Sequence, residues 1–379
     1  MPYVRKRFLA NKVMKKGGKI LAQGADTCVF EPEVACTGNK VAITGDTQGP
    51  FISRIIPEEE HEHINQRNAL ASIKADLQND TVDDQNDVLA HFLFGSFYCT
   101  PNTTDDDFRD VHGYSDCNFD DGDRVISRHN KPNNPQHVNI ITPKYKGDIA
   151  NRNGLIRSKE DTKGGLYNLM AALTFINKEH PVVHFDAHPG NLGWKNNRIV
   201  LSDWGRVVFH QEECYLSERY EQSFKQFFYP IKLLKKLNRF NIFYKMTKDV
   251  AVVWDILAIT KTAEHFGLVT TSNAETFLNT VVSLVQRAGL DNTFSMDLRD
   301  ELIHALRALF GYPPVVLTPV SSPTTSTTSS LNLTPSPPPA PAPTPVSSTR
   351  PIRRTNRLNG GNKTRKSISK KGRGRTRRT

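Results

Sequence analysis

The pattern of apolar and polar positions along the chain predicts a strand-rich first part and a helix-rich last part. Two stretches, 18–30 and 40–56, have the composition of short strands joined by turns. Pro57 and the glutamates after it predict a helix over 58–78, because proline suits the first helical position and carboxylates suit the positive end of a helix. The aspartate-rich stretch 103–124 is expected to form an exposed loop between strands.

Helical periodicity becomes clear beyond the middle of the chain. From Leu166 onward, apolar residues recur at helical spacing, at Leu169, Met170, Leu173 and Ile176. Two short strands are expected to follow, at 182–185 and 198–202. The last third is then predicted to be helical, with helices over 247–266, 272–288 and 296–310. A capping box of Ser272 and Glu275 is expected to start the second of these helices.

Charge is distributed very unevenly along the sequence. The chain of 379 residues has a formal net charge of +11, but residues 350–379 contain 13 Lys and Arg and no acidic residue. The residues before them hold 37 basic and 39 acidic side chains, a net charge of −2. The basic character therefore belongs to the tail and not to the folded part. The 37% of hydrophobic residues can fill a sizeable core.

The C-terminal region has the composition of a linker followed by a basic tail. Residues 312–349 carry no charge and are rich in Pro, Ser and Thr, which predicts a disordered spacer with polyproline II bias. The tail, 350–379, would attract nucleic-acid phosphates without base specificity, and it also resembles a nuclear localisation signal. A disordered tail that only aids solubility or non-specific adhesion is the alternative.

Cysteine spacing and hydropathy suggest a compartment. The five cysteines are odd in number, widely spaced and free of C-x-x-C pairs, at Cys28, Cys36, Cys99, Cys117 and Cys214. This pattern argues against a disulfide framework and a structural zinc site, so a reducing compartment is expected. No run of about 18 apolar residues predicts a membrane span, and the charged N-terminus does not resemble a signal peptide. The sequence therefore predicts a soluble intracellular protein.

The strongest chemical signal is a loop pattern of the form H-x-D-x-x-x-x-N, followed by a strand and D-x-G. The first part runs from His184 through Asp186 to Asn191, and the second consists of Asp203 and Gly205. Phosphoryl transfer needs an aspartate near the acceptor hydroxyl, an asparagine that helps to hold a metal, and a second aspartate on that metal. The intervening strand allows all three groups to converge on one cleft, with Asp203 at a turn that Gly205 permits.

This pattern resembles the catalytic and metal-binding loops of protein kinases and of their aminoglycoside-phosphotransferase-like relatives. The resemblance implies that Asp186 is the catalytic base, that His184 belongs to the same catalytic loop, and that Asn191 and Asp203 are ligands of magnesium. It also matches Asp255 to an aspartate of a central helix in the second lobe. ATP and Mg²⁺ are the implied cofactors.

The N-terminal region supports the same resemblance less cleanly. A glycine-rich phosphate loop aligned on Val29 keeps only Gly24 of its three glycines, with Ala22 and Thr27 in the other places, and a plain β-hairpin is the alternative. Together with the stretch Phe51 to Ile56, the region resembles the serine/threonine kinase-like proteins of large DNA viruses.

The phosphate-contacting lysine of those proteins is replaced here. Arg54 stands at the matching position, and a planar guanidinium does not replace an ammonium conservatively. Lys40 is the rival for the role. If Arg54 is the match, Glu62 is the preferred acidic partner, in competition with Glu58, Glu59 and Glu60, all of which could equally be solvated acids at a helix start.

Other departures leave the acceptor open. His188 stands where protein kinases commonly have lysine, and Trp204 where they usually have phenylalanine, a pattern similar to the small-molecule phosphotransferases. Tyr145 and its neighbours are expected to form the hinge beside adenine.

The complete prediction is an α+β protein with a two-lobed kinase-like fold. A β-rich lobe is expected over 17–145 and a mainly helical lobe over 146–311. The predicted function is that of a viral serine/threonine protein kinase, acting on a protein substrate in the host cytoplasm or nucleus or packaged in the virion. The alternatives are a catalytically impaired pseudokinase scaffold with a nucleic-acid-binding tail, and a small-molecule kinase.

Overall fold

A computed structural model describes the chain over residues 19–23, 27–58, 61–102, 137–145, 148–151, 154–216 and 227–313. All of these residues belong to one contact unit, Met1–Leu317. The aspartate-rich stretch 103–124, the tail 350–379 and all but the first two residues of the linker 312–349 lie outside the described residues. The predicted domain boundaries therefore stay predictions.

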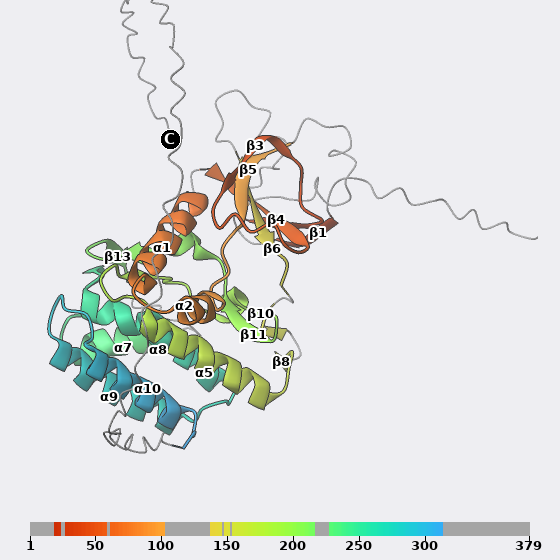
Figure 1. Cartoon of the computed structure of the whole chain (residues 1–379). Helices are drawn as coiled ribbons and strands as arrows, with labels where there is room; N and C mark the ends of the chain where they lie inside the picture. The colour runs from red at the N-terminus through yellow and green to blue at the C-terminus, as the bar shows by residue number, and fades with distance from the viewer. Residues whose placement is uncertain are drawn as a thin grey trace, which may run out of the picture. The chain divides into compact units, whose positions relative to one another are not determined.

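The first part of the chain forms a six-stranded antiparallel sheet (Figure 1). Its strands follow the spatial order β1-β2-β4-β6-β5-β3. Their bounds are β1 Lys19–Gln23, β2 Cys28–Glu31, β3 Cys36–Ala42, β4 Phe51–Pro57, β5 Phe97–Pro101 and β6 His137–Pro143.

Strands β4 and β6 form the centre of this sheet. They pair over seven positions, from Phe51 opposite Pro143 to Pro57 opposite His137. Both are rich in β-branched residues, whose side chains pack well on a pleated surface. Every residue of β6 is buried, whereas the edge strand β3 is mostly exposed. The pairing with β6 fixes the register of β4, and with it the position of Arg54.

The helix predicted over 58–78 begins later than expected. Pro57 is the last residue of β4, a strand-end position that tolerates proline, and α1 spans Glu62–Leu77. His61 precedes the helix with φ 49°, in the left-handed region. Glu58 therefore lies outside the helix, and Glu62 becomes the acidic residue of its first turn.

The second part of the chain is mainly helical. Its long helices are α5 Lys159–Phe175, α7 Phe228–Lys236, α8 Lys248–His265, α9 Thr271–Ala288 and α10 Met296–Leu309. Helix α8 is buried on nearly all sides and contacts α5, α7 and α9 (Figure 1), as expected for a helix that is apolar all round. The predicted α+β class, with strands first and helices later, is confirmed. Among the described helices, none has the length and apolar content to cross a bilayer.

The predicted capping box at the start of α9 is wrong. Thr270 is the N-cap, and its side chain accepts a hydrogen bond from the backbone nitrogen of Asn273 at 3.1 Å. Glu275 instead accepts a hydrogen bond from Lys232 of α7 at 2.6 Å. The carboxylate of Glu275, which the local pattern assigned to the helix start, thus forms an ion pair with Lys232 of another helix instead.

Several shorter elements complete the structure. The hairpin of β10 Leu192–Lys195 and β11 Arg198–Leu201 turns at Asn196 and Asn197, both with positive φ, as a two-residue hairpin turn requires. Of this hairpin only β11 was predicted from the sequence, and the other predicted short strand, 182–185, contains β9. Helices α2 Val82–Leu89 and α7 were missed, and the remaining short strands are β7 Ala150–Asn151, β8 Gly154–Leu155, β9 Val182–Val183, β12 Val208–Phe209, β13 Glu213–Tyr215 and β14 Phe243–Lys245.

The expectation of reduced cysteines is not met. A disulfide joins Cys36 of β3 to Cys99 of β5, two neighbouring strands whose backbones already hold the sulfur atoms close together. Cys28 is disulfide-bonded as well, while Cys214 is free and buried. Spacing along the sequence missed these bonds because 63 residues separate Cys36 from Cys99.

Replacing Arg299 by alanine is expected to destabilise the helical part. Its buried guanidinium donates to the backbone carbonyls of Thr174, Ile176 and Asn177, where α5 ends. The variant leaves these oxygens without their donor, so the free energy of unfolding should fall by about 3 kcal/mol. Urea unfolding followed by circular dichroism measures the change. Arg287→Ala, which removes an exposed ion pair with Glu301, is the matched control and should change stability little.

Candidate active site

The predicted catalytic loop joins β9 to β10 and is held at its start by a carboxylate from α8. Asp255 accepts hydrogen bonds from the backbone nitrogens of His184, at 2.7 Å, and Phe185, at 3.1 Å. Phe185 has φ 65°, a left-handed conformation that is costly for a bulky residue. Burial raises the pKa of Asp255 to about 7, although the two backbone donors oppose this shift. A central helix therefore fixes the strained entry to the loop.

The imidazole ring of His184 is hydrogen-bonded through both of its nitrogens. It is fully buried, with its Nε2 atom 2.7 Å from the carbonyl oxygen of Ser202. Its Nδ1 atom accepts a hydrogen bond from the backbone nitrogen of Asp186 at 3.3 Å. Because a carbonyl only accepts, Nε2 carries the proton, and burial lowers the pKa of His184 to about 4. The neutral ring joins the loop to the end of β11, and the place of His184 among the predicted catalytic residues stays a prediction.

Asn191 holds the carboxylate of Asp186. Its amide nitrogen donates to the backbone oxygen of Asp186 at 2.9 Å and to the Oδ2 atom at 3.3 Å. Asn191 ends a short 3₁₀ turn, Pro189–Asn191, which the side chain of His188 caps by accepting from the nitrogen of Gly190. Since the amide nitrogen faces Asp186, the amide oxygen is turned away from it and is available to a cation.

Asp203 leaves the end of β11 in a left-handed conformation. Its φ is 64°, so the strained residue of the D-x-G turn is the aspartate itself. Gly205 was predicted to permit this turn, but the structure gives another reason for a glycine here. A Cβ atom at this position would lie 3.0 Å from the side chain of Glu62. Its carbonyl oxygen also accepts a hydrogen bond from Asn65 of α1 at 2.8 Å. Glycine at this position lets α1 approach the loop closely.

Trp204, the residue after Asp203, packs into the protein core. Its ring is buried, stacks on Phe94 with centroids 4.7 Å apart, and meets His184 edge-on at 4.8 Å. The indole nitrogen donates to the carbonyl oxygen of Leu201. The side chain therefore packs inward while the neighbouring carboxylate of Asp203 faces outward, with 40% of its side chain exposed.

Arg54 of β4 connects the sheet to two acidic residues, Glu62 and Asp203. Its Nη1 atom lies 2.5 Å from Glu62 of α1, and its Nη2 atom lies 2.9 Å from the Oδ1 atom of Asp203. Glu62 also accepts from Gln66, one helical turn along α1, whose own amide oxygen accepts from the backbone of Gly95. Of the predicted alternatives, the structure brings Arg54 and Glu62 together; Glu58 is exposed, and Glu59 and Glu60 lie outside the described residues.

Lys40 lies elsewhere on the sheet. It belongs to the edge strand β3, is exposed, and forms an ion pair with Glu33 at 2.9 Å. Val29 of β2 pairs with Arg54 of β4, so the strand predicted to follow the phosphate loop does border the Arg54 position. The backbone of Ala22 belongs to β1, opposite Val29, while Gly24 lies outside the described residues. The phosphate loop as a whole therefore stays a prediction.

Tyr145 follows β6, at the place predicted for the hinge. Burial raises the pKa of its phenol, and the side chain of Ser202 opposes this shift. Arg54 and Asp203 are close enough to influence that pKa. Sequence reasoning missed this proximity to Arg54 and Asp203, because nothing in the local pattern indicates which way a tyrosine after a strand will point.

The two aspartates differ in their protonation behaviour. Burial raises the pKa of Asp186, although His188 and Arg206 oppose the shift. Burial acts in the same sense on Asp203, but the Arg54 guanidinium outweighs it and holds the pKa of Asp203 below its ordinary value. Each carboxylate also influences the other, so both belong to one electrostatic cluster. A carboxylate with a raised pKa suits a proton acceptor, and one with a lowered pKa suits a cation ligand.

The cluster fits a magnesium ion in its chemistry. The carboxylate of Asp203 and the amide oxygen of Asn191 are hard oxygen donors, which magnesium prefers, and it uses few protein ligands beside water and phosphate. Within the described part of the chain, no group of three or more His, Cys, Asp or Glu side chains forms a closed metal cage. A site completed by nucleotide and water is the arrangement that these residues allow.

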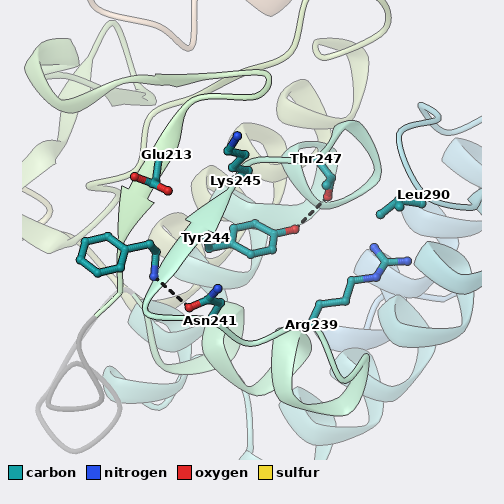
Figure 2. Close-up of a pocket in the computed structure, with 8 residues that line it drawn as sticks. Glu213, Arg239, Asn241, Tyr244, Lys245, Thr247 and Leu290 are labelled. Carbon is teal, nitrogen blue, oxygen red and sulfur yellow. Dashed lines mark hydrogen bonds between the residues drawn. The ribbon is translucent and has the colours of Figure 1, made fainter.

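A separate pocket of about 430 Å³ lies beside strands β13 and β14 in the helical part. Figure 2 shows the hydroxyl of Tyr244 directed at Thr247, to which it is hydrogen-bonded at 2.8 Å. Arg239 on the same wall is held by buried Asp249 at 2.5 Å. These polar groups satisfy one another, and none of the residues predicted to be functional lines this pocket.

Comparisons with known proteins add little to this picture. No protein-family model matches the sequence, and no curated protein matches it. Among solved structures, the chain is similar to vaccinia related kinase 3, with a TM-score of 0.41 and 9% sequence identity over 78% of this chain and 90% of that one.

Acid is expected to destabilise the protein through His184. The pKa of this group is lowered from 6.5 to about 4, so its contribution is complete above pH 6.5 and is lost as the pH falls toward 4. The loss should reach about 3 kcal/mol. In His184→Gln the amide can still donate to Ser202 but does not titrate. Urea unfolding at pH 7 and pH 4.5 should show a smaller acid loss in the variant; equal losses would contradict the assignment.

Proposed function

We propose that the chain is an ATP-dependent phosphotransferase that transfers the γ-phosphate to a serine or threonine hydroxyl of a protein. The observation that supports this most strongly is the meeting of four parts of the chain at one cluster. The catalytic loop supplies Asp186 and Asn191, the end of β11 supplies Asp203, and the Arg54–Glu62 pair of β4 and α1 faces Asp203. Phosphoryl transfer depends mainly on positioning and charge stabilisation, which such a cluster supplies.

Each side chain has a role that follows from its surroundings. Asp186, with its raised pKa, would accept the proton of the acceptor hydroxyl, while Asn191 and the backbone contact of His184 keep its carboxylate in place. Asp203 and Asn191 would hold magnesium, which neutralises phosphate charge when bound. Arg54 would orient phosphate oxygens through its planar fork of donors.

Two other functions each have an observation in their favour. The Arg54–Asp203 contact occupies one oxygen of the predicted metal ligand, which favours a scaffold with weak or no catalysis. His188 stands at a position where protein kinases commonly have lysine, and its Nε2 atom lies 3.7 Å from Asp186. This substitution favours a small-molecule acceptor. Both alternatives use the same cluster, so acceptor and activity assays distinguish them.

We also propose that the tail, 350–379, binds nucleic acid without base specificity, in the setting of a large DNA virus. Its 13 positive charges and complete lack of acidic residues support this proposal, because each phosphate contact releases counterions. The remainder of the chain is near neutral and offers no comparable excess of positive charge.

Transfer of labelled γ-phosphate from magnesium-ATP tests the catalytic proposal. Asp186→Asn should lower transfer to a mixed protein substrate by about a hundredfold to ten-thousandfold, because it removes the proton acceptor and keeps the shape. Asp84→Asn, in the exposed first turn of α2, is the control and should retain the activity. Transfer to small hydroxyl compounds alone would identify the small-molecule alternative. Equal transfer by both variants would contradict the role of Asp186.

Salt dependence tests the tail. The full chain should bind a random-sequence single-stranded oligonucleotide, with an affinity that falls linearly in log–log form by roughly 0.7 per phosphate contacted. Fluorescence anisotropy between low and physiological salt measures this slope. A chain that ends at residue 349 should lose most of the binding and most of the slope. Retention of both would place the nucleic-acid contact outside the tail.

A further inference from the structure

The guanidinium of Arg54 already supplies a positive charge to the carboxylate that would hold a metal. Its Nη2 atom lies 2.9 Å from Asp203 while Nη1 contacts Glu62, so one group bridges two acids. Its side chain is only 12% exposed, whereas that of Asp203 is 40% exposed. Burial alone would lower the pKa of Arg54, but Asp203 and Glu62 raise it above the ordinary value. The guanidinium is therefore charged at every working pH.

We propose that Arg54 is a resident counter-cation of Asp203 that competes with a divalent cation for this carboxylate and so sets the metal affinity of the site. This inference depends on the proposed phosphotransferase function, because that function assigns a metal to Asp203. It goes further in making Arg54 the residue that regulates metal binding and not only a phosphate contact.

The charges around Asp203 explain why a competitor matters. One guanidinium contacts the carboxylates of Glu62 and Asp203, and Asp203 in turn lies close enough to Asp186 to influence its pKa. The formal charge of this group stays negative, so a second cation is still attracted to it. It must, however, approach a carboxylate whose Oδ1 atom is already engaged in a charge-assisted hydrogen bond. Metal binding then requires the guanidinium to share Asp203 or to withdraw from it.

Other basic side chains near the site do not compete in this way. His184 is neutral, since burial lowers its pKa to about 4 and its ring is bonded on both sides. Lys40 is paired with Glu33 on the edge strand. His188 and Arg206 act on Asp186 through their charges, and no ion pair of either with Asp203 is found among the described residues. Arg54 is thus the cation in direct contact with Asp203 in this part of the chain.

The side-chain shape of arginine is essential to the bridge. Its two terminal nitrogens point in different directions from a rigid plane, so Glu62 and Asp203 can each receive one. Lysine has one compact ammonium and would hold one acid more loosely or choose between them. Substitution by lysine should therefore weaken the competition without removing the charge that the buried Glu62 requires.

Direct measurement of Mn²⁺ binding to the full chain, by calorimetry and by electron paramagnetic resonance, tests the proposal without any assay of activity. Manganese is suited to the same oxygen ligands as magnesium. Arg54→Gln should raise Mn²⁺ affinity by on the order of tenfold or more, and Arg54→Lys should raise it less. Arg198→Gln, which removes an exposed arginine paired with Asp87, is the matched control and should change nothing.

The double variant with Asp203→Asn identifies the route of the effect. If Arg54 acts by competing for this carboxylate, Asp203→Asn should weaken Mn²⁺ binding, and Arg54→Gln should have no further effect in its presence. Thermal unfolding of each variant verifies that the fold is intact. Should Arg54→Gln fail to fold, Arg54→Lys carries the same comparison.

The outcomes separate the inference from the function on which it depends. Equal Mn²⁺ affinity in wild type, Arg54→Gln and Arg54→Lys, with loss in Asp203→Asn, overturns the competition and leaves the metal ligand in place. Unchanged affinity in Asp203→Asn, or no binding to any variant, overturns the inference together with the metal assignment. Weaker binding in Arg54→Gln would show that Arg54 supports the site and does not compete for it.

Discussion

The bridge from Arg54 to Glu62 and Asp203 is the interaction on which the geometry of the site depends. It joins strand β4, helix α1 and the end of β11, three elements that no backbone pairing connects. Taking such charges out of water costs several kcal/mol per ion, and their attraction returns this only with good geometry. The bridge is therefore poorly explained as a source of stability, and its value lies in positioning α1 against the loop at Asp203.

A second set of contacts holds the start of the predicted catalytic loop, which runs from His184 to Asn191. Asp255 of α8 accepts two backbone hydrogen bonds at its start, and neutral His184 joins it to the end of β11. Two bulky or charged residues, Phe185 and Asp203, have positive φ values, which persist only where surrounding contacts hold them. The buried helix α8 thus holds the left-handed residue Phe185 at the start of this loop.

The sequence predicted much of this arrangement, and its failures have physical causes. Periodicity located α5, because a long helix repeats its apolar positions several times, and start and stop signals located α8, α9 and α10. It missed α2 and β10, which are too short for such repetition. The loop from His184 to Asn191 could be singled out as a candidate site because its residue types recur at fixed local spacing. The contact of Arg54 with Asp203 and the disulfide of Cys36 join residues that are distant in the sequence, and no local pattern contains that information.

Local rules also failed where a tertiary partner competed for the same group. Glu275 had the right spacing for a capping box, yet Lys232 of another helix binds it, and Thr270 caps α9 instead. Pro57 had the right character for a helix start, yet strand pairing with His137 took it into β4. In both places an interaction worth about 1 kcal/mol was available locally, and the packed sheet or helix bundle offered more.

The balance between enzyme and scaffold comes down to a single difference in free energy. Asp186, Asn191, His184 and Asp255 are arranged in the same way for either function, because none of them contacts Arg54 directly. What distinguishes the two is whether Asp203 interacts more favourably with the guanidinium at 2.9 Å or with a metal and nucleotide phosphates. Phosphates would offer the guanidinium new acceptors as the carboxylate is released, so nucleotide and metal binding would favour each other. In the proposed enzyme, nucleotide binding would therefore draw the guanidinium of Arg54 away from Asp203 and free this carboxylate for the metal.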